Sequence, residues 1–454
     1  MWSIMEAALV HLEAACQKAS QRRQLGDSGN RGMVYRKVTY RLYPSAGQAE
    51  RLQEMLGLHQ RLYNTALEER IRVYRETGKG LSFADQCKVL TQWRKAVPAL
   101  AALNAQSEQV TLKRLHLAFQ HFFRRVKNGE TPGFPRFKNI HRYPGWGYKT
   151  NGDGWKLHMG ESGKHGSLYL QSLGNIPIRG KPRTAGKPVT CEVLHKAGRW
   201  YASVTLEIES VHRERGTDIG AFDWGLADYL TIVTPNGMET VANPRHLRNQ
   251  LAELKRLGQE VSRKIRTAQQ ISGKKKGFPV SASLRRAIQH LACLHAKIAR
   301  SRKDFLHQTS AWLISRFGAL ATEILDMVRD GGARKKGLHR EIHAAAPSAF
   351  LKMTRTKAEE AGSWYEEAPT RQLKPTQRCH ACWKLPDERK KLSDRRHQCP
   401  HCGTTCGRDE NAALVLLRWL ETRLAGESGS GREPSEVWSG GGFAAMKHKT
   451  HAIT

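Results

Sequence analysis

The sequence predicts an α+β protein with several domains, and three observations lead to this fold class. The chain has 454 residues, which at about 150 residues per domain corresponds to roughly two to four domains. Hydrophobic residues make up 39 % of the chain, enough to build buried cores, so wholesale disorder is excluded. Stretches with strand-like alternation occur both before and after stretches with helical spacing, so we expect helices to be inserted within β modules.

The first β module is predicted from residues 34–216. Residues 34–43 are rich in β-branched and aromatic side chains, as in a strand, and Pro44 ends it. From Gln48 to about Val126 apolar residues recur every three or four positions, which predicts helices. Residues 145–216 return to short strand-like runs. The strands of this module are therefore expected to be discontinuous in sequence.

A second module begins with residues 218–234, which are typical of two core strands followed by a turn at residues 235–237. Two basic helices should follow, one with Leu247, Leu251 and Leu254 on its apolar face and the other around residues 284–303. Such charges are often only a solvated helix face. Because two consecutive helices are both basic, we favour a surface that lines a phosphate backbone.

The net charge points to a polyanionic partner. The chain contains 75 Lys and Arg against 41 Asp and Glu, a formal charge of +34. The excess is spread from Arg22 to Arg432 rather than confined to a tail, which favours nucleic acid. No apolar run is long enough to span a bilayer, and the first residues do not resemble a secretion signal. We therefore expect a cytoplasmic protein.

The nine cysteines are unevenly distributed, with five of them between Cys379 and Cys406. Cys379 and Cys382 are followed, after sixteen intervening residues, by Cys399 and Cys402. Two such CxxC pairs can supply four thiolates to one tetrahedral Zn²⁺, and a site with no open position is structural. His380, His397 and His401 are alternative ligands if one cysteine is not used.

Three acidic residues stand out near apolar segments. Asp223 follows an apolar run, Glu323 ends a second apolar run, and Asp409 opens a predicted helix. A carboxylate at the end of a buried strand is unfavourable unless it is paired or binds a cation. Carboxylates from two strands and a helix can converge on Mg²⁺. The spacing alone leaves open that Asp409 is only a helix N-cap.

The ordered set of motifs resembles the transposon-encoded TnpB proteins and the related small type V CRISPR effectors. The resemblance runs from about residue 34 to about residue 420. The matching segments are Tyr40–Pro44, Phe122–Arg125, Gly133–Lys138, Gly220–Leu226, Arg302–His307, Thr322–Glu323, the two cysteine pairs and Arg408–Ala413.

The resemblance implies an RNA-guided DNA endonuclease with an RNase H-like RuvC domain. Asp223, Glu323 and Asp409 would then be the catalytic ligands of two Mg²⁺ ions, and the zinc site would be structural. Guide RNA and target double-stranded DNA are the implied partners. Guide pairing would choose the sequence while the protein reads a short flanking motif.

The resemblance also implies a division into domains, with a split β-barrel wedge, an inserted helical recognition domain, and a RuvC domain that carries an inserted zinc ribbon. The predicted boundaries are 1–33 for an N-terminal extension, 34–60 and 145–216 for the wedge, 61–144 for the recognition domain, 217–375 and 406–424 for RuvC, 376–405 for the ribbon and 425–454 for a disordered tail.

Nucleic-acid contacts are predicted at nine positions. By position in the family, three of them would meet the flanking motif, although the two glutamines among them could equally be ordinary surface residues. The other six are basic residues, two at the end of the helical stretch before residue 126 and four on the predicted helix around residues 284–303. The nine are Phe83, Gln106, Gln109, Arg124, Arg125, Arg285, Arg286, Arg302 and Lys303.

The chain departs from the family's pattern in a few places. Many relatives have an acidic residue directly after the second-motif Glu, whereas Ile324 follows Glu323 here, so Asp326 is a possible substitute ligand. Trp383 stands where Gly often follows the first cysteine pair, and Cys406 and Gly407 precede Arg408 where Asp is common.

Other functions remain as alternatives. A guide-directed DNA-binding repressor would share the architecture but lack cleavage, and loss of the acidic residues would mark it. A transposase that joins DNA ends without a guide RNA, or a simple zinc-ribbon DNA-binding protein, would account for fewer of the segments.

Overall fold

The structure is a computed structural model that describes residues 34–161, 165–180, 185–209, 213–324, 336–391, 394–426 and 449–451. The chain divides into two compact units, Arg31–Ser210 and a second unit that contains Val211–Thr454. Each unit is described by itself. The N-terminal extension expected at residues 1–33 lies outside the described residues.

The unit Arg31–Ser210 is built on an antiparallel sheet of seven strands in the order β2-β6-β7-β1-β5-β4-β3. Strand β1 pairs with β7 along one edge and with β5 along the other. The first strand in sequence is thus central in the sheet, which requires the later strands to close around it. The strands are β1 (Val34–Leu42), β2 (Gly145–Tyr148), β3 (Trp155–Met159), β4 (His165–Leu170), β5 (Gly174–Arg179), β6 (Lys187–Lys196) and β7 (Arg199–Ile208).

Helices are inserted between β1 and β2, as the sequence predicted. Helix α2 begins with a capping box between Ser45 and Gln48 and ends at Gly78, whose φ of 67° allows the left-handed cap. It runs without a break through residue 60, where we divided the wedge from the recognition domain. The helices are α2 (Ala46–Thr77), α3 (Phe83–Ala96), α4 (Pro98–Ala101), α5 (Ala105–Lys127) and the 3₁₀ turn η1 (Ile140–Arg142).

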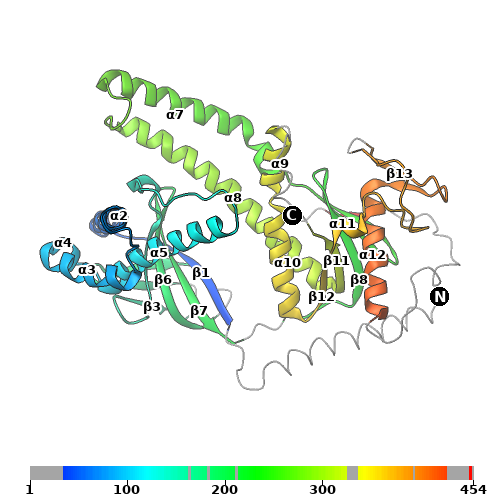
Figure 1. Ribbon diagram of the computed structural model, residues 1–454, viewed down its shortest axis with the longest axis horizontal. Coiled ribbons are helices and arrows are strands. Elements are labelled where there is room, and N and C mark those ends of the chain that lie inside the picture. The colour runs from blue at the N-terminus through cyan, green and yellow to red at the C-terminus, as the bar shows by residue number, and fades with distance from the viewer. Residues whose placement is uncertain are drawn as a thin grey trace. The chain divides into compact units, whose positions relative to one another are not determined.

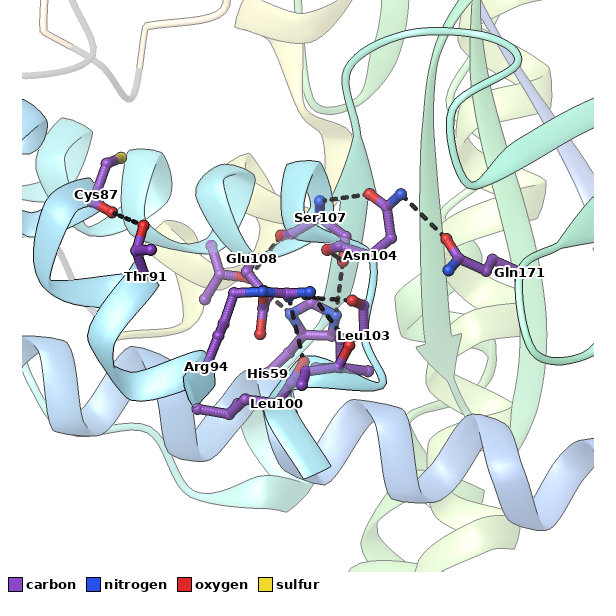
Figure 2. A network of polar contacts seen from close by, with 12 residues as sticks. His59, Cys87, Thr91, Arg94, Leu100, Leu103, Asn104, Ser107, Glu108 and Gln171 are labelled. Carbon is purple, nitrogen blue, oxygen red and sulfur yellow. Dashed lines mark hydrogen bonds and ion pairs between the residues drawn. The ribbon is translucent and has the colours of Figure 1, made fainter. Parts of the chain in front are cut away.

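A buried polar network joins α2, α3 and α5 (Figure 2). His59 on α2 contacts Thr111 through Nδ1 at 3.0 Å and Ser107 through Nε2 at 3.3 Å, and it has no exposed surface. Arg94 on α3 is paired with the buried Glu108 and donates to the carbonyls that end α4. Asn104 caps α5 by accepting from the Ser107 N–H at 3.1 Å. These bonds fix how the inserted helices pack on one another.

The second unit is built on a mixed sheet in the order β12-β11-β8-β9-β10-β15. Strands β8, β11 and β12 run parallel, while β9 is antiparallel to both β8 and β10. The strands are β8 (Asp218–Trp224), β9 (Asp228–Thr234), β10 (Gly237–Ala242), β11 (Phe317–Glu323), β12 (Trp364–Ala368) and β15 (Lys449–His451).

Helices cover both faces of this sheet (Figure 1). Ala221, Ala319 and Ala321 share a buried cluster with the apolar side of α12 (Arg408–Gly426). On the other face, Phe222 and Leu320 pack with α8 (Ala282–Arg316) and α10 (Pro347–Ala361). The alternation of side chains along a strand therefore decides which residues meet α12.

The remaining elements of the second unit lie outside the sheet. Strands β13 (Arg396–Gln398) and β14 (Thr405–Gly407) form a small ribbon just before α12. Helices α7 (Leu251–Ser272) and α8 are the predicted basic pair, and residues 274–277 lie in the loop between them. Leu247, which we expected on the first of these helices, instead lies in the separate short helix α6 (His246–Asn249), because the chain leaves helical geometry at Gln250. No helix among the described residues is long and apolar enough to cross a membrane. The short helices are α6 (His246–Asn249), α9 (Lys336–Ala345) and α11 (Thr370–Leu373).

The C-terminal segment that we expected to be disordered, residues 425–454, is described only in part. Helix α12 continues to Gly426, and β15 pairs in parallel with β10. The rest of that segment lies outside the described residues.

The buried histidine of the α2–α5 network makes the stability of the fold sensitive to acid. Burial lowers the pKa of His59 from 6.5 to about 3, so the folded chain keeps this ring neutral while the unfolded chain protonates it. Stability from this residue is therefore present above pH 6.5 and lost as the pH falls, by about 1.4 kcal/mol per pH unit. When the pH falls from 6.5 to 5, the free energy of unfolding of His59→Gln should therefore decrease by about 2 kcal/mol less than that of the wild type.

The measurement is urea unfolding of the full chain at both pH values, followed by tryptophan fluorescence. His121→Gln serves as the control because His121 is exposed on α5, and it should keep the wild-type pH dependence. A wild-type pH dependence in His59→Gln would contradict the buried neutral ring.

Candidate functional site

Three carboxylates gather on the sheet face that α12 covers. Ala221 on β8 pairs with Ala321 on β11 in a parallel ladder, so Asp223 and Glu323, each two residues further on, lie level on adjacent strands. Residues two apart in a strand share a face, and Ala221 and Ala321 both face α12. Asp409 lies in the first turn of α12. The topology thus brings together the three acidic residues that the sequence singled out.

The electrostatics of this cluster reflect burial first and, for Asp223, the nearby like charges second. Burial, with the carboxylates of Glu323 and Asp409 nearby, raises the pKa of Asp223 well above its ordinary value, while the Trp224 backbone N–H and Arg408 oppose the rise. Burial raises the pKa of Glu323 to about 7. The Asp409 side chain is 37 % exposed, so the cluster is open to solvent on that side. Such a cluster favours a cation, because a cation relieves the repulsion.

The position at which α12 begins tests whether Asp409 is only a helix N-cap, the alternative that the sequence left open. Helix α12 begins at Arg408, which places Asp409 inside the first turn rather than at the N-cap. The residue that accepts from the backbone there is Glu410, whose Oε2 takes the Gly407 N–H at 3.1 Å. Asp409 is instead 3.3 Å from Arg408 Nε. The N-cap interpretation of Asp409 is therefore wrong. Asp326, the possible substitute ligand, lies outside the described residues.

The four cysteines of the CxxC pairs form a single cluster in which the ligand atoms all lie within 4.8 Å of one another. The Sγ atoms of Cys379 and Cys402 are 3.7 Å apart, and those of Cys382 and Cys399 are 3.5 Å apart. Tetrahedral coordination with metal–sulfur bonds of about 2.3 Å would place sulfurs about 3.8 Å apart. The cluster therefore fits a structural metal such as zinc.

The three histidines considered as alternative ligands have other contacts. His380 Nδ1 bonds to Asn411 Oδ1 at 3.0 Å, and His401 Nε2 lies 3.0 Å from the Leu385 carbonyl. His397 is buried and its Nδ1 contacts Lys390 Nζ. The cysteine cluster is complete without them.

Each cysteine pair ends in a left-handed residue. Gly403 has φ of 72° and donates its N–H to the Cys399 carbonyl, and Trp383 has φ of 63° with the same bond to the Cys379 carbonyl. A non-glycine residue there is strained by about 1–3 kcal/mol. The guanidinium groups of Arg378 and Arg418 lie 5.2 and 4.8 Å from the Trp383 ring. These cation–π contacts explain how Trp is tolerated where relatives often have Gly.

The predicted nucleic-acid residues of the first unit differ in their surroundings. The Phe83 ring stacks near His116 and lies under Lys113 Nζ. Gln109 accepts from Lys149 Nζ at 3.0 Å, whereas Gln106 Oε1 is buried with no hydrogen-bond partner among the described residues. Arg124 and Arg125 are exposed near the end of α5.

The predicted basic residues of the second unit all lie on α8. Arg285, Arg286 and Lys303 are exposed. Arg302 is partly buried and donates to the carbonyls of His343 and Ala344 at the end of α9, at 3.3 and 3.5 Å. Arg302 therefore forms hydrogen bonds within the protein, whereas its charge alone had predicted only a contact with nucleic acid. Its role toward nucleic acid, like that of the other eight, stays a prediction.

Two further polar residues, Asn411 and Arg418, are buried on α12 and were not among the residues predicted from the sequence. Asn411 lies inside the motif Arg408–Ala413. A polar residue in the buried part of a helix was the sequence feature that could have marked it as functional.

Family models match three segments of the chain. A model described as "Probable transposase" matches residues 203–329, one described as "Cas12f1-like, TNB domain" matches residues 348–416, and one described as "Helix-turn-helix domain" matches residues 33–79. These matches support the resemblance of the chain to the TnpB and small type V effector proteins. The third match covers β1 and the single helix α2 in this structure, rather than two helices joined by a turn.

Relatives of similar length come from two bacteria. A candidate RNA-guided DNA endonuclease of Streptomyces pristinaespiralis is 27 % identical over 434 residues, which cover 93 % of this chain and 98 % of that protein. Another, from Mycobacterium tuberculosis strain CDC 1551, is 25 % identical over 427 residues, which cover 86 % of this chain and 87 % of that one.

A solved structure supports the fold. The chain of a Cas12f1–sgRNA–target DNA complex matches with a TM-score of 0.51 at 12 % identity, over 85 % of this chain and 99 % of that one. The mixed α/β architecture is therefore shared with that effector.

The cysteine cluster predicts which thiols hold metal. Cys399→Ser should lower bound zinc from about one ion per chain to well below one, because a tetrahedral site loses one of its four thiolates. Cys406→Ser should keep the wild-type content, since Cys406 is not part of the cluster. Elemental analysis of the dialysed full chain measures both. Full zinc in Cys399→Ser, or its loss in Cys406→Ser, would show that the ligand set is different.

Proposed function

We propose that this protein is an RNA-guided DNA endonuclease that cleaves guide-complementary DNA beside a short flanking motif. The observation that carries the proposal is that Asp223 and Glu323 lie level on adjacent strands and that both Glu323 and Asp409, in the first turn of α12, are near enough to raise the pKa of Asp223. The family relatives named above, candidate RNA-guided DNA endonucleases, align with 93 % and 86 % of the chain. The net charge of +34 favours binding of a polyanion. The acidic cluster would hold the divalent ions that hydrolysis of that polyanion needs.

The three carboxylates are proposed as the ligands of two Mg²⁺ ions. Carboxylate oxygens are the hard ligands that Mg²⁺ prefers. Asp223, Glu323 and Asp409 would hold the ions, which would supply the Lewis acidity needed to activate a water molecule and to stabilise the leaving 3′-oxygen of a phosphodiester. Without a cation the carboxylates would repel the phosphate, since both are negatively charged. The solvent-exposed side of Asp409 is the side from which a strand could approach.

The cysteine cluster is proposed to hold Zn²⁺ as a structural ion. All four positions of the tetrahedron would be filled by Cys379, Cys382, Cys399 and Cys402, which leaves no position for a substrate or water. The ion would stabilise the ribbon that precedes α12.

Basic residues are proposed to bind guide RNA and target DNA through their backbones. Exposed Arg124 and Arg125 on α5 and Arg285, Arg286 and Lys303 on α8 could each neutralise a phosphate, which would make binding weaken as salt increases. Guide pairing would supply sequence choice, and the protein would read the flanking motif. Phe83, Gln106 and Gln109 remain our candidates for that reading, because a Gln amide can pair with adenine N6 and N7.

The domain assignment follows from the same proposal. The antiparallel sheet of the first unit would be the split β-barrel wedge, interrupted by the helical recognition domain. The mixed sheet of the second unit would be the RNase H-like RuvC domain, into which the zinc ribbon is inserted between β12 and α12.

The proposal predicts that cleavage and binding can be separated. Asp223→Ala should reduce guide-dependent cleavage by at least about a thousandfold, because it removes a ligand of the ions that activate the water. Binding of the guide RNA and matched DNA should stay within about twofold of wild type, since the phosphate contacts remain. The assay uses purified full-length protein, its native RNA, a guide-matched DNA library with randomised flanks, and Mg²⁺.

A matched control is Asp218→Asn on the same strand. Asp218 is exposed and paired with Arg316, so its loss should leave the cleavage rate near wild type. Guide-dependent binding with no cleavage by wild-type protein would favour the repressor alternative, and the absence of both would contradict the proposal.

A further inference from the structure

The first turn of α12 carries a buried asparagine that the acidic cluster does not use. Asn411 has no exposed surface and lies two residues after Asp409. Its Oδ1 accepts from the backbone N–H of His380 at 3.1 Å and from the ring Nδ1 of the same residue at 3.0 Å. Its Nδ2 donates to the carbonyls of Arg378 at 2.7 Å and Pro375 at 3.3 Å. One side chain therefore holds both neighbours of Cys379.

These four contacts need an amide. Two of the partners are N–H donors and must face an acceptor, and two are carbonyl oxygens and must face a donor. A carboxylate at this position would face two carbonyl oxygens without a proton to share. An apolar side chain would remove the partner of all four groups, and a buried polar group without a partner is destabilising. The chemistry of the contacts thus accounts for Asn at residue 411.

Arg418 attaches the same segment two turns further along α12. Its Nη1 donates to the carbonyls of His380 at 2.9 Å and Ala381 at 2.8 Å, both between Cys379 and Cys382. Its guanidinium also covers the Trp383 ring. A metal held by four thiolates carries a net charge of about −2, so a buried cation on this side is electrostatically favourable.

The start of α12 is also continuous with the ribbon. Strand β14 ends at Gly407 and the helix begins at Arg408. The Arg408 N–H donates to the Arg395 carbonyl at 2.9 Å, beside β13. The ribbon and the first cysteine pair therefore contact the first turn of α12 at several points, and Figure 1 shows β13 next to α12.

The side chains of Asp409 and Asn411 point in opposite directions from this turn. Each residue of an α-helix advances about 100° around the axis, so residues two apart differ by about 200°. Asp409 therefore faces the sheet that carries Asp223, and Asn411 faces the first cysteine pair. A rotation or shift of the first turn that loosened one contact would displace the other.

We propose that Asn411 is a positioning residue that couples the metal-bound first cysteine pair to the placement of the Asp409 carboxylate. The proposal rests on the function proposed above, in which Asp409 is a ligand of the catalytic ions. With Asn411 in place, the folded ribbon fixes the first turn of α12 and so prearranges the third carboxylate. Without it, the third carboxylate is less well placed, and the acidic cluster binds divalent ions more weakly.

The test is a Mg²⁺ titration of guide-dependent cleavage by full-length Asn411→Ala. The Mg²⁺ concentration for half-maximal rate should increase about tenfold, the smaller of the effects expected when a residue that supports a ligand is lost. The maximal rate at saturating Mg²⁺ should fall much less. Zinc content and guide-RNA affinity should remain at wild-type values, a separation that general unfolding would not produce.

Gln377→Ala is the matched control, because Gln377 is also an amide beside the first cysteine pair, but among the described residues its side chain bonds to Lys390 rather than to α12. It should leave the Mg²⁺ requirement unchanged. His380→Ala is a milder variant that keeps the backbone bond to Asn411, and it should shift the requirement in the same direction by a smaller factor. It gives the answer if Asn411→Ala does not fold.

Hydrogen exchange separates failure of this inference from failure of the proposed function. Amides of residues 408–413 should exchange about tenfold faster in Asn411→Ala than in wild type, whether or not the protein cleaves DNA. Wild-type protein that does not cleave, combined with faster exchange here, would overturn the nuclease assignment and keep the mechanical coupling. Unchanged exchange and an unchanged Mg²⁺ requirement in both variants would overturn the coupling.

Discussion

Electrostatic repulsion among three carboxylates is the constraint on which the rest of this structure depends. Asp223 is 6 % exposed and lies level with Glu323 on the neighbouring strand, an arrangement that would be unfavourable for stability alone. The short side chains of Ala221, Ala319 and Ala321 let α12 approach the same face closely, and Asp409 enters with it. The fold thus creates a concentrated negative charge inside a positively charged chain, where a divalent cation and a phosphate backbone can meet.

The zinc ribbon is best understood through its connection to this helix. The ribbon is small and has little core of its own, so a metal is an efficient way to fold it. Its first cysteine pair contacts α12 through Asn411 and Arg418, and its last strand leads directly into the first turn. The proposed structural metal and the carboxylate proposed as a catalytic ligand would therefore be neighbours, because α12 contacts the first cysteine pair and also carries Asp409.

The sequence predicted those parts of the site that depend on local spacing. The CxxC pairs identified the metal cluster, because each pair is a tight turn. The ends of the two apolar runs located Asp223 and Glu323. The residue pattern raised their convergence with Asp409 while leaving the N-cap role open, and the family resemblance then favoured convergence. What the sequence could not predict depends on packing between distant segments. The hydrogen bonds of Asn411, the contact of Arg302 with the end of α9, and the left-handed conformation of Trp383 are examples.

The most direct test of the account is the location of Mn²⁺, a scatterer that can replace Mg²⁺, in crystals of the protein bound to its guide RNA. Anomalous diffraction should place at least one ion within coordination distance, about 2.0–2.3 Å, of carboxylate oxygens from Asp223, Glu323 and Asp409. Ions found only elsewhere, or a carboxylate of this set that coordinates no ion and stays paired with a basic side chain, as Asp409 is with Arg408 in the ion-free structure, would contradict the hydrolytic assignment.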